Sequence, residues 1–375
     1  MLILLYLNWN EIFSILMSLG ISLVWMIMNV MKYKFKISHL LLNLMWLIMV
    51  LFFMTQSVWK FYLLFEMNMI PMVLILMGWG MNMARMTSSI YMMMYTMFFS
   101  LPVLIIILNN WKLIFFSTFD IKNHYMILFY KLILIIMFMA KIPIFGLHYW
   151  LPKAHVEAST MGSMILAGGL LKMGSFGFFK VFVWTSILMN SSWVLLGTLI
   201  SSFYCFVQSD QKKLIALSSV SHMGLATSAF MMMSNVGTTG MILLNFTHSV
   251  ISSFMFFNAG SLSSHSKSRL LSFIPKMSKH LMMMFALGIV VNLGLPPSFS
   301  FMSELFSISG IFFMNFNTML LIFFIMILTL SFSCMYIMGL YQTNFMSNNN
   351  MSLSMVFLQI LHFSFMMFWV FYQMI

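Results

Sequence analysis

Apolar runs of about 20 residues recur along the whole sequence, and short polar segments separate them. A helix of that length crosses the roughly 30 Å hydrocarbon core of a bilayer. The pattern predicts spans at 9–31, 38–56, 58–79, 90–109, 126–148, 158–182, 185–207, 212–233, 236–258, 281–314, 317–341 and 351–374. A transmembrane β-barrel would instead alternate apolar and polar positions, and this alternation is absent. The sequence therefore predicts an all-α polytopic membrane protein with about twelve transmembrane helices.

Two stretches of the sequence contain residues that interrupt a membrane-spanning helix. The first runs over Lys141–Gly174 and includes a connector at 143–157 that carries prolines and histidines. The second is the run 281–314, which is too long for one straight span and contains the sequence LPP at 295–297. Proline removes a backbone donor from a helix, and broken helices mark ion or substrate sites in many transporters. We therefore expect two broken helices beside an ion path.

Composition excludes a soluble domain. Of the 375 residues, 62% are hydrophobic and 6% are charged, whereas a soluble surface needs about a quarter charged residues. The net charge of +12 is spread over short loops and forms no basic face, so no nucleic-acid partner is expected. Cys205 and Cys334 lie singly inside predicted spans without metal or redox spacing, which favours a packing role.

Basic residues predict the orientation in the membrane because they are enriched in loops that are not translocated. The loops after odd-numbered spans hold Lys32, Lys34, Lys36, Arg85, Lys153, Lys212, Lys213, Lys267, Arg269, Lys276 and Lys279, and those after even-numbered spans hold mainly Lys60, Lys112, Lys122 and Lys180. The odd loops should face the compartment of synthesis, with both termini on the opposite side. The N-terminus lacks the features of a signal peptide or an import presequence, so insertion during synthesis from inside the compartment is expected. We expect one transmembrane domain over 1–375.

Few acidic residues are present, and two of them are predicted to lie deep in the bilayer. The six are Glu11, Glu66, Asp120, Glu157, Asp210 and Glu304. Four fall near span ends, where a solvated charge is the simplest interpretation. Glu66 lies about 12 Å along its helix, and Glu304 follows the proline pair. For both, the alternative to a functional acid is a protonated carboxyl that hydrogen-bonds between helices.

Lys141 and Lys172 are the candidate basic groups of the ion path. A lysine near the bilayer midplane costs roughly 3 kcal/mol, and it is usually retained only where it faces a wet interior. Burial favours the neutral form of an ionisable group and an ion pair favours the charged form. A lysine that is alternately paired with Glu66 and released could therefore hold and lose a proton, and Lys141 is the natural partner. The alternative for Lys172 is that its amine snorkels to an interface, as Lys180 should.

Histidines extend the candidate proton path. His222 and His248 lie within spans among hydroxyl residues, where they could relay protons or only hydrogen-bond between helices. His148 and His155, in the connector, are weaker candidates because a structural role explains them as well. The main buried series is thus Glu66, Lys141, Lys172, His248 and Glu304. No nucleotide-binding fingerprint, metal cluster or nucleophile arrangement is present in the sequence.

Five segments, in order, resemble the family of mitochondrial NADH–ubiquinone oxidoreductase chain 4. They read LLFEMNMIP, KIPIFGLHYWLPKAHVEAS, GSMILAGGLLKMGSFG, QSDQKKLIALSSVSHMG and NLGLPPSFSFMSEL. These chains are antiporter-like membrane subunits of respiratory complex I and are related to cation/proton antiporter subunits. The resemblance runs from about residue 9 to the end, and LPKAHVEA with SSVSHMG favours chain 4 over its sibling chains 2 and 5.

The resemblance implies a fold of two inverted repeats, each with one broken helix, which we place at 58–207 and 212–341. By position in the motifs, the family's essential glutamate and its partner lysine correspond to Glu66 and Lys141. The central lysine corresponds to Lys172, the histidine of the connecting helix to His248, and the terminal glutamate to Glu304. The chain is expected to be N-terminally shortened relative to the fourteen helices of the family. Ser159 stands where a proline is usual, and QSDQKKLIAL replaces QTDLKSLIAY.

The function that follows is proton translocation in the mitochondrial inner membrane by a subunit of NADH:ubiquinone oxidoreductase. The resemblance implies partner subunits of the membrane arm, especially chains 2 and 5, with lipids around them. NAD, flavin, iron–sulfur clusters and ubiquinone would be bound by other subunits, and none by this chain. Both termini should face the intermembrane space. The alternatives are a cation/proton antiporter subunit and a purely structural membrane spacer.

Overall fold

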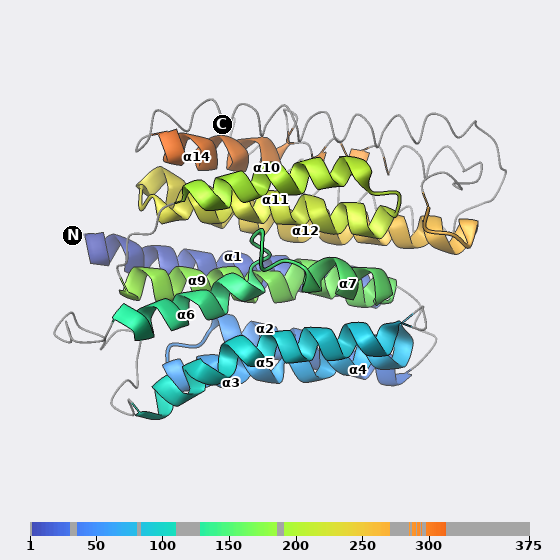
Figure 1. Cartoon of the computed structure of the whole chain (residues 1–375), viewed down its shortest axis with the longest axis horizontal. Helices are drawn as coiled ribbons and strands as arrows, with labels where there is room; N and C mark the ends of the chain where they lie inside the picture. The colour runs from blue at the N-terminus through green and yellow to red at the C-terminus, as the bar shows by residue number, and fades with distance from the viewer. Residues whose placement is uncertain are drawn as a thin grey trace. The chain divides into compact units, whose positions relative to one another are not determined.

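The computed structural model describes residues 2–30, 36–80, 84–109, 128–185, 191–270 and 298–312, with 285, 287–289, 291, 292 and 294. The chain forms two compact units, the first over 1–25 and 32–189 and the second over 26–31 and 190–375 (Figure 1). Several predictions lie outside the described residues: the spans 317–341 and 351–374, the proline pair at 296–297, Cys334, Asp120, and the loop lysines at 32, 34, 112, 122, 276 and 279.

The first unit consists of helices joined by short connections. They are α1 (Leu2–Val30, of which 26–30 belong to the second unit), α2 (Lys36–Phe53), α3 (Val58–Met67), α4 (Met69–Trp79), α5 (Arg85–Asn109), α6 (Leu128–Lys141), α7 (Trp150–Glu157), α8 (Thr160–Ile165), a π-helical turn η1 (Leu166–Leu170) and α9 (Leu171–Thr185). Helix α9 packs against α2 and α6, and α5 packs against α4, α6 and α7. The α9 helix is therefore a central element of this unit.

The second unit contains α10 (Ser192–Val207), α11 (Gln211–Met231), α12 (Asn235–Ser266) and α14 (Phe299–Phe312). Helix α11 packs between α10 and α12, and α14 packs against α11 and α12. The division between the compact units falls before α10, whereas the predicted repeats divide after it. Compactness and repeat symmetry are different properties, so the repeats at 58–207 and 212–341 stay a prediction.

Six described helical segments are long and apolar enough to cross a membrane. They are Trp9–Asn29, Val58–Trp79, Arg85–Leu108, Thr160–Val183, Gln211–Met231 and Asn235–Ser264. Shorter apolar helices cover Ile37–Phe53, Ser192–Cys205 and Phe299–Ile311. The predicted all-α fold with helices long and apolar enough to span a bilayer is thus confirmed for the described residues, and such helices satisfy their own backbone groups in lipid. The expected number of about twelve spans stays a prediction.

The first broken helix is present, but its boundaries differ from those predicted. Helix α6 ends at Lys141, so the predicted span 126–148 is wrong at its C-terminal end, and residues 150–157 of the expected connector form helix α7. Pro143 explains the early end because the residue before a proline is pushed out of the helical conformation. Gly146, with φ +96°, then adopts a backbone conformation that favours glycine.

A second interruption, at Asn68 within the predicted span 58–79, was not predicted. Helix α3 ends at Met67 and α4 begins at Met69. Pro71 accounts for it, since its nitrogen cannot donate to the carbonyl of Met67. The interruption lies two residues after Glu66 and therefore next to the first candidate site.

Loops that the charge pattern places on one side of the membrane lie together in the structure. In the second unit, Asp210 forms an antiparallel bridge with Leu270, and the Gln211 backbone N–H donates to the Arg269 carbonyl at 3.1 Å. These segments follow the seventh and ninth predicted spans. In the first unit, the Lys180 amine donates to the carbonyl of Thr55, a residue near the end of the second predicted span, at 2.7 Å. The side of the membrane that each group faces stays a prediction.

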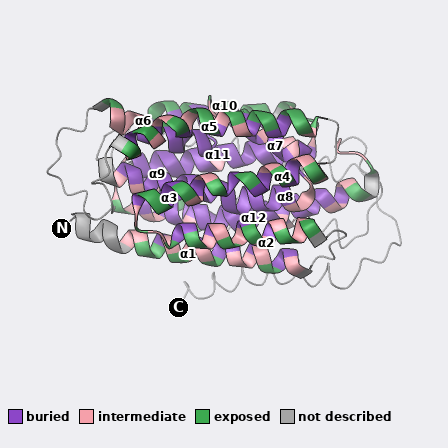
Figure 2. Ribbon diagram, turned by 90° about the horizontal axis from the view of Figure 1, so that it is seen from below, coloured by how far each residue is buried: buried purple, intermediate pink, exposed green. Residues whose placement is uncertain are grey.

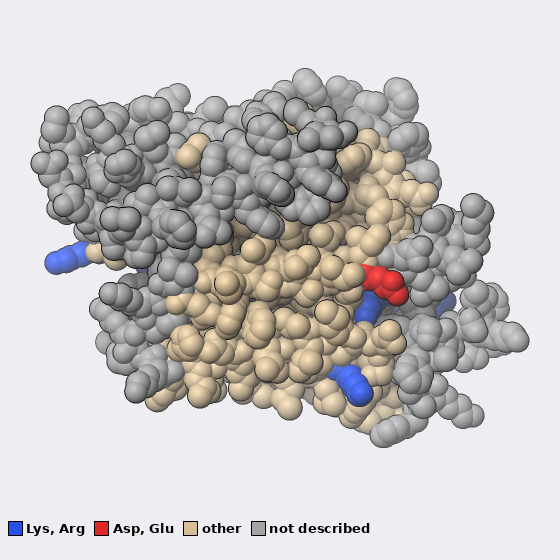
Figure 3. Space-filling view, turned by 180° about the vertical axis from the view of Figure 1, so that it is seen from behind, with Lys and Arg blue, Asp and Glu red and all other residues tan. Residues whose placement is uncertain are grey.

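Burial separates central helices from outer ones. Helices α9, α11 and α12 are largely buried, whereas α3, α5 and α10 carry exposed positions along one side (Figure 2). The exposed side chains of α5 include Phe98, Leu101 and Ile105, as expected for a surface that contacts lipid or another subunit. The described surface seen in Figure 3 is uncharged across its middle, with lysine, arginine and acidic side chains near its margins.

Helices α12 and α14 run antiparallel and approach each other closely through glycine. A Cβ atom added at Gly240 would lie 2.5 Å from the backbone nitrogen of Ser307, and one added at Gly310 would overlap Gly237. The Ser234 hydroxyl donates to the Gly310 carbonyl at 3.1 Å. Small residues permit such close backbone approach in membrane helices. This packing fixes where the side chains of α14 lie against α12.

Candidate functional site

The ion pair expected between Glu66 and Lys141 is present in the first unit. The Nζ atom of Lys141 lies 3.5 Å from Oε1 of Glu66, and the two side chains are 4% and 23% exposed. A strong charge-assisted hydrogen bond between such groups measures about 2.7–2.9 Å. The pair is therefore close enough to stabilise both charges but is longer than a strong hydrogen bond.

Local structure places Lys141 at the end of a helix and against α9. Lys141 is the last residue of α6. The Trp150 indole of α7 donates to the carbonyl of Ala140 at 3.0 Å, which satisfies an acceptor that the break leaves free. A Cβ atom added at Gly174 would lie 3.2 Å from the backbone and Cβ of Lys141. Gly174 therefore lets α9 approach the point where α6 ends.

Lys172 is fully buried near the N-terminus of α9, directly after the π-helical turn. Its complete burial shows that the snorkelling alternative is wrong for this lysine. Lys180, by contrast, directs its amine to the Thr55 carbonyl near the end of the unit, as a snorkelling lysine would. Gly174, which contacts Lys141, lies two residues after Lys172 on the same helix. The structure thus brings α9 and its buried lysine to the helix end that carries Lys141.

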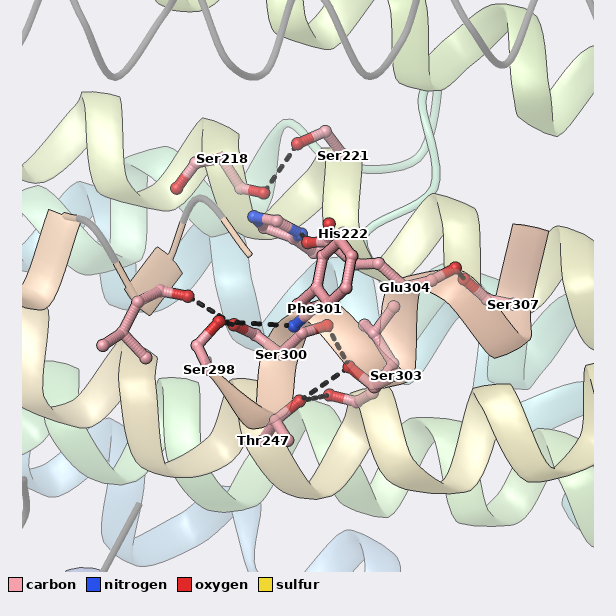
Figure 4. A network of polar contacts seen from close by, with 12 residues as sticks. Ser218, Ser221, His222, Thr247, Ser298, Ser300, Phe301, Ser303, Glu304 and Ser307 are labelled. Carbon is pink, nitrogen blue, oxygen red and sulfur yellow. Dashed lines mark hydrogen bonds and ion pairs between the residues drawn. The ribbon is translucent and has the colours of Figure 1, made fainter. Parts of the chain in front are cut away.

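The second unit contains another acid–base pair. Nδ1 of His222 on α11 lies 3.4 Å from Oε1 of Glu304 on α14, and both side chains are mostly buried (Figure 4). The ring of His222 lies 5.9 Å from the ring of His248 on α12, centroid to centroid. Sequence reasoning ranked His248 above His222, yet His222 forms the 3.4 Å contact with Glu304. The three residues form one cluster on three helices.

The Glu304 carboxylate packs against a glycine in the left-handed region. Gly294 has φ +62°, and a Cβ atom added there would lie 2.5 Å from Oε2 of Glu304. Both the backbone conformation and the space therefore require glycine at this position. This contact was not predicted, although Gly294 directly precedes the LPP sequence in NLGLPPSF.

Sequence reasoning did not single out several hydroxyl groups that lie near Glu304. The Thr247 and Ser303 hydroxyls lie 3.3 Å apart, and each directly precedes a candidate residue, His248 or Glu304 (Figure 4). Ser303 also donates to the Ser300 carbonyl at 2.8 Å, and the Ser300 hydroxyl donates to the Val291 carbonyl at 2.5 Å. The sequence signal was the serine content of PSFSFMSEL. These groups make the surroundings of Glu304 polar and tie α14 to α12.

We expect Thr247→Val to lower the thermal stability of the assembled protein by about 1 kcal/mol more than Thr238→Val does. Valine keeps the shape of threonine but removes the hydroxyl that reaches Ser303. Thr238 is the matched control because it is buried on the same helix and donates to Asn235 of that helix. Thermal inactivation of both variants measures the difference. Equal losses would show that the contact between the two helices adds nothing.

The connector histidines have structural surroundings. The backbone N–H of Gly146 donates to Nδ1 of His148 at 3.3 Å, and the ring of His148 stacks between Phe145 and Tyr149 with centroids 5.0 Å and 4.7 Å away. These contacts favour the structural alternative for His148. His155 is fully buried on α7. A relay role for either histidine stays a prediction.

Burial corrects one expectation about the acidic residues. Glu157, expected to be a solvated charge at a span end, is buried at the C-terminus of α7. Its backbone carbonyl lies 3.0 Å from the position that a Cβ at Gly80 would occupy, so packing of α7 against the end of α4 removes it from solvent. Asp210 behaves as expected, in a surface ion pair with Lys213 at 3.0 Å. Within the described ranges, no three histidine, cysteine, aspartate or glutamate side chains come together as a metal site.

The chain is similar to known membrane subunits over most of its length. Residues 55–329 match a family described as NADH:quinone oxidoreductase/Mrp antiporter, TM. The chain is 34% identical to NADH-ubiquinone oxidoreductase chain 4 of Rhipicephalus sanguineus, with 96% of this chain and 88% of the relative covered. It is 36% identical to the chain 4 protein of Ascaris suum, with 66% of this chain covered. The match spans 62% of the length of that relative.

Solved structures with the same fold include subunits of two kinds of membrane complex. A chain of respiratory complex I from Thermus thermophilus with bound NADH superposes with a TM-score of 0.84 and 21% identity, covering 96% of this chain and 79% of that one. A chain of the Mrp complex from Dietzia superposes with a TM-score of 0.78 and 14% identity, covering 91% and 68%. At these identities the likeness shows an antiporter-like helical fold.

Proposed function

The chain belongs to the family of NADH:quinone oxidoreductase and Mrp antiporter transmembrane subunits, and from this premise we propose that it translocates protons as a subunit of mitochondrial respiratory complex I. Relatives of 34–36% identity carry the name of chain 4 of that enzyme. The observation that carries the proposal is the buried acid–base pair in each unit, Glu66 with Lys141 and Glu304 with His222. Such pairs are expensive to bury and mark proton paths in membrane proteins.

The proposed cycle uses the opening and closing of the first pair. While the pair is closed, the Glu66 carboxylate stabilises the Lys141 ammonium. When the pair opens, the buried ammonium loses that stabilisation and can then pass its proton to Lys172. Lys141 then takes a new proton when Glu66 returns as a carboxylate. The charge state of each group thus depends on the other, and such coupled changes in charge allow a site to move protons in one direction.

The second unit would receive and release the proton. His248 and His222 can each accept a proton on one ring nitrogen and give one up from the other. Glu304 can hold the proton as a neutral carboxyl, because it can then donate to His222, and as a carboxylate it can accept from the same ring. We propose release by way of Glu304. The redox energy that drives the cycle would come from other subunits, which would also hold NAD, flavin, iron–sulfur clusters and ubiquinone.

The remaining parts of the proposal concern location and partners. A multi-pass position in the mitochondrial inner membrane follows from the relatives' names and from the six apolar spans. We propose that chains 2 and 5 of the same enzyme are the neighbouring antiporter-like subunits and that both termini face the intermembrane space. Exposed apolar side chains on α5 offer a surface for lipid or for such a neighbour.

A cation/proton antiporter subunit is the second candidate function. The family description includes Mrp antiporters, and a chain of an Mrp complex shares the fold. The same buried pairs would then exchange a proton for a cation without electron transfer. The two functions differ in their partners and in whether transport depends on NADH.

The deciding experiment is native gel electrophoresis of gently solubilised membranes, with an in-gel stain for NADH oxidation and mass spectrometry of each band. We expect this chain in a large band that oxidises NADH. Its presence only in a small band without NADH oxidation would overturn the complex I proposal and favour the antiporter. Cation exchange in vesicles without NADH would then be measured.

A further inference from the structure

The Lys141 ammonium has two partners of different kinds on successive residues of α3. Its Nζ atom lies 3.1 Å from the centroid of the Phe65 ring and 3.5 Å from Oε1 of Glu66. An ammonium over the face of an aromatic ring is attracted by the negative charge density of that face, most strongly where water is excluded. The Phe65 ring and the Glu66 carboxylate therefore both attract the Lys141 ammonium from adjacent positions of the helix.

The two partners differ in what they can do with a proton. The Glu66 carboxylate can accept one and become neutral, which ends its attraction for the ammonium. The Phe65 ring accepts no proton, so its attraction depends only on the charge and position of Lys141. Opening of the Glu66 pair thus removes one partner and leaves the other in place.

The two partners also differ in freedom of movement. Glu66 is 23% exposed, whereas Phe65 is fully buried. The Phe65 ring is held by other rings, with centroid distances of 5.1 Å to Phe138 and 5.9 Å to Phe52. A side chain packed on several sides cannot follow the carboxylate when it moves. The ring face is therefore a fixed feature of the site and the carboxylate a mobile one.

We propose that Phe65 is a positioning residue for proton transfer: its ring keeps the Lys141 ammonium in place while the Glu66 pair is open. Without the ring, the ammonium would lose both partners when the Glu66 pair opens. It would then either leave its position or give up its proton before Lys172 can receive it. This inference rests on the proposed proton-translocating function and adds a residue to it. It gives Phe65 a role that a carboxylate at the same position could not fill.

The test compares variants of Phe65 with and without an aromatic ring. Phe65→Leu and Phe65→Met remove the ring, and Phe65→Tyr keeps it. Phe13→Leu is the matched control, since Phe13 is also fully buried in the first unit, but its described ring contacts are with Phe176 and Phe179 and do not include Phe65. Each variant is made in the whole complex, and its assembly is followed on native gels. The measured quantity is the number of protons translocated per NADH oxidised in coupled vesicles.

We expect the ring-free variants to assemble and to lose most of the protons per NADH that this subunit contributes to the whole complex, whereas Phe13→Leu should keep the normal ratio. Phe65→Tyr should restore most of the loss. In a Lys141→Ala background, Phe65→Leu should cause no further loss, because the ring then has no ammonium to hold. Methionine fills an aromatic site flexibly, so Phe65→Met provides a ring-free variant if leucine impairs assembly.

Several results would overturn the inference. Equal translocation by Phe65→Leu and Phe13→Leu would do so, as would a Phe65→Tyr variant that assembles but performs no better than leucine. Failure of both ring-free variants to assemble would also count against it, since the role would then be structural. Normal translocation by Glu66→Gln would instead overturn the proposed function itself. The failure of one proposal can therefore be distinguished from the failure of the other.

Discussion

Glu66→Gln is expected to abolish proton translocation through this subunit while the complex still assembles. Glutamine has nearly the shape of glutamate but carries no charge, so the ion pair with Lys141 at 3.5 Å is lost without a change in packing. Removing one member of a buried ion pair leaves the other charge uncompensated, at a cost of about 3–5 kcal/mol. The Lys141 ammonium then cannot be held in the closed state, and the cycle has no starting point. Lys141→Ala should also abolish proton translocation, because it removes the other member of the pair.

The measurement is a pH-sensitive dye in sealed vesicles during NADH oxidation, which reports protons translocated per NADH. Glu11→Gln is the control, because it makes the same chemical change at an exposed glutamate on α1. We expect Glu11→Gln to translocate protons at the normal ratio and Glu66→Gln to lower the ratio by the whole share that this subunit contributes. An assembled Glu66→Gln complex that pumps normally would contradict the proposed role.

The second large effect is expected for Gly240→Ala, which should weaken the packing of α12 against α14 by about 1–3 kcal/mol. The added methyl group would lie 2.5 Å from the backbone nitrogen of Ser307 and 2.7 Å from the carbonyl carbon of Phe306. Backbone atoms cannot rotate away as a side chain can, so α14 must shift. That shift would also move Glu304 relative to His222, and both stability and translocation should fall.

Gly78→Ala is the matched control because nothing lies within 4 Å of a Cβ atom at that helical position. In an open helical site alanine is favoured over glycine by roughly 0.5–1 kcal/mol. Thermal inactivation of the solubilised complex should therefore occur at lower temperature for Gly240→Ala and at an unchanged or higher one for Gly78→Ala. Equal behaviour of the two variants would show that the close contact does not limit stability.

Much of the candidate site was accessible from the sequence because ionisable residues in apolar runs are rare. Glu66, Lys141 and Lys172 were selected on that basis, and the structure places all three in the first unit, with two of them in contact. The same reasoning missed Phe65, since a phenylalanine in a span carries no signal among the 42 phenylalanines of the chain. Its position under an ammonium depends on the angle at which α3 meets the end of α6.

The ranking of the histidines shows a similar limit. His222 and His248 both lie within spans among hydroxyl residues, so the sequence offers no physical reason to prefer one as the neighbour of Glu304. Which histidine reaches the carboxylate depends on how α11 and α14 are rotated about their axes. Close approach of α12 and α14 through Gly240 and Gly310 helps to set that rotation.

The sequence by itself determined the class of protein and the residues able to carry charge in the membrane. Both are local properties: a run of about 20 apolar residues must form a helix in lipid to satisfy its own backbone groups, and a buried ionisable side chain is recognisable wherever it occurs. The burial of Glu157, the pairing of Glu304 with His222 and the ring under Lys141 were decided only by the tertiary structure. Each depends on contacts between segments far apart in the chain, and the sequence of one segment does not state which residue of a distant segment it will meet.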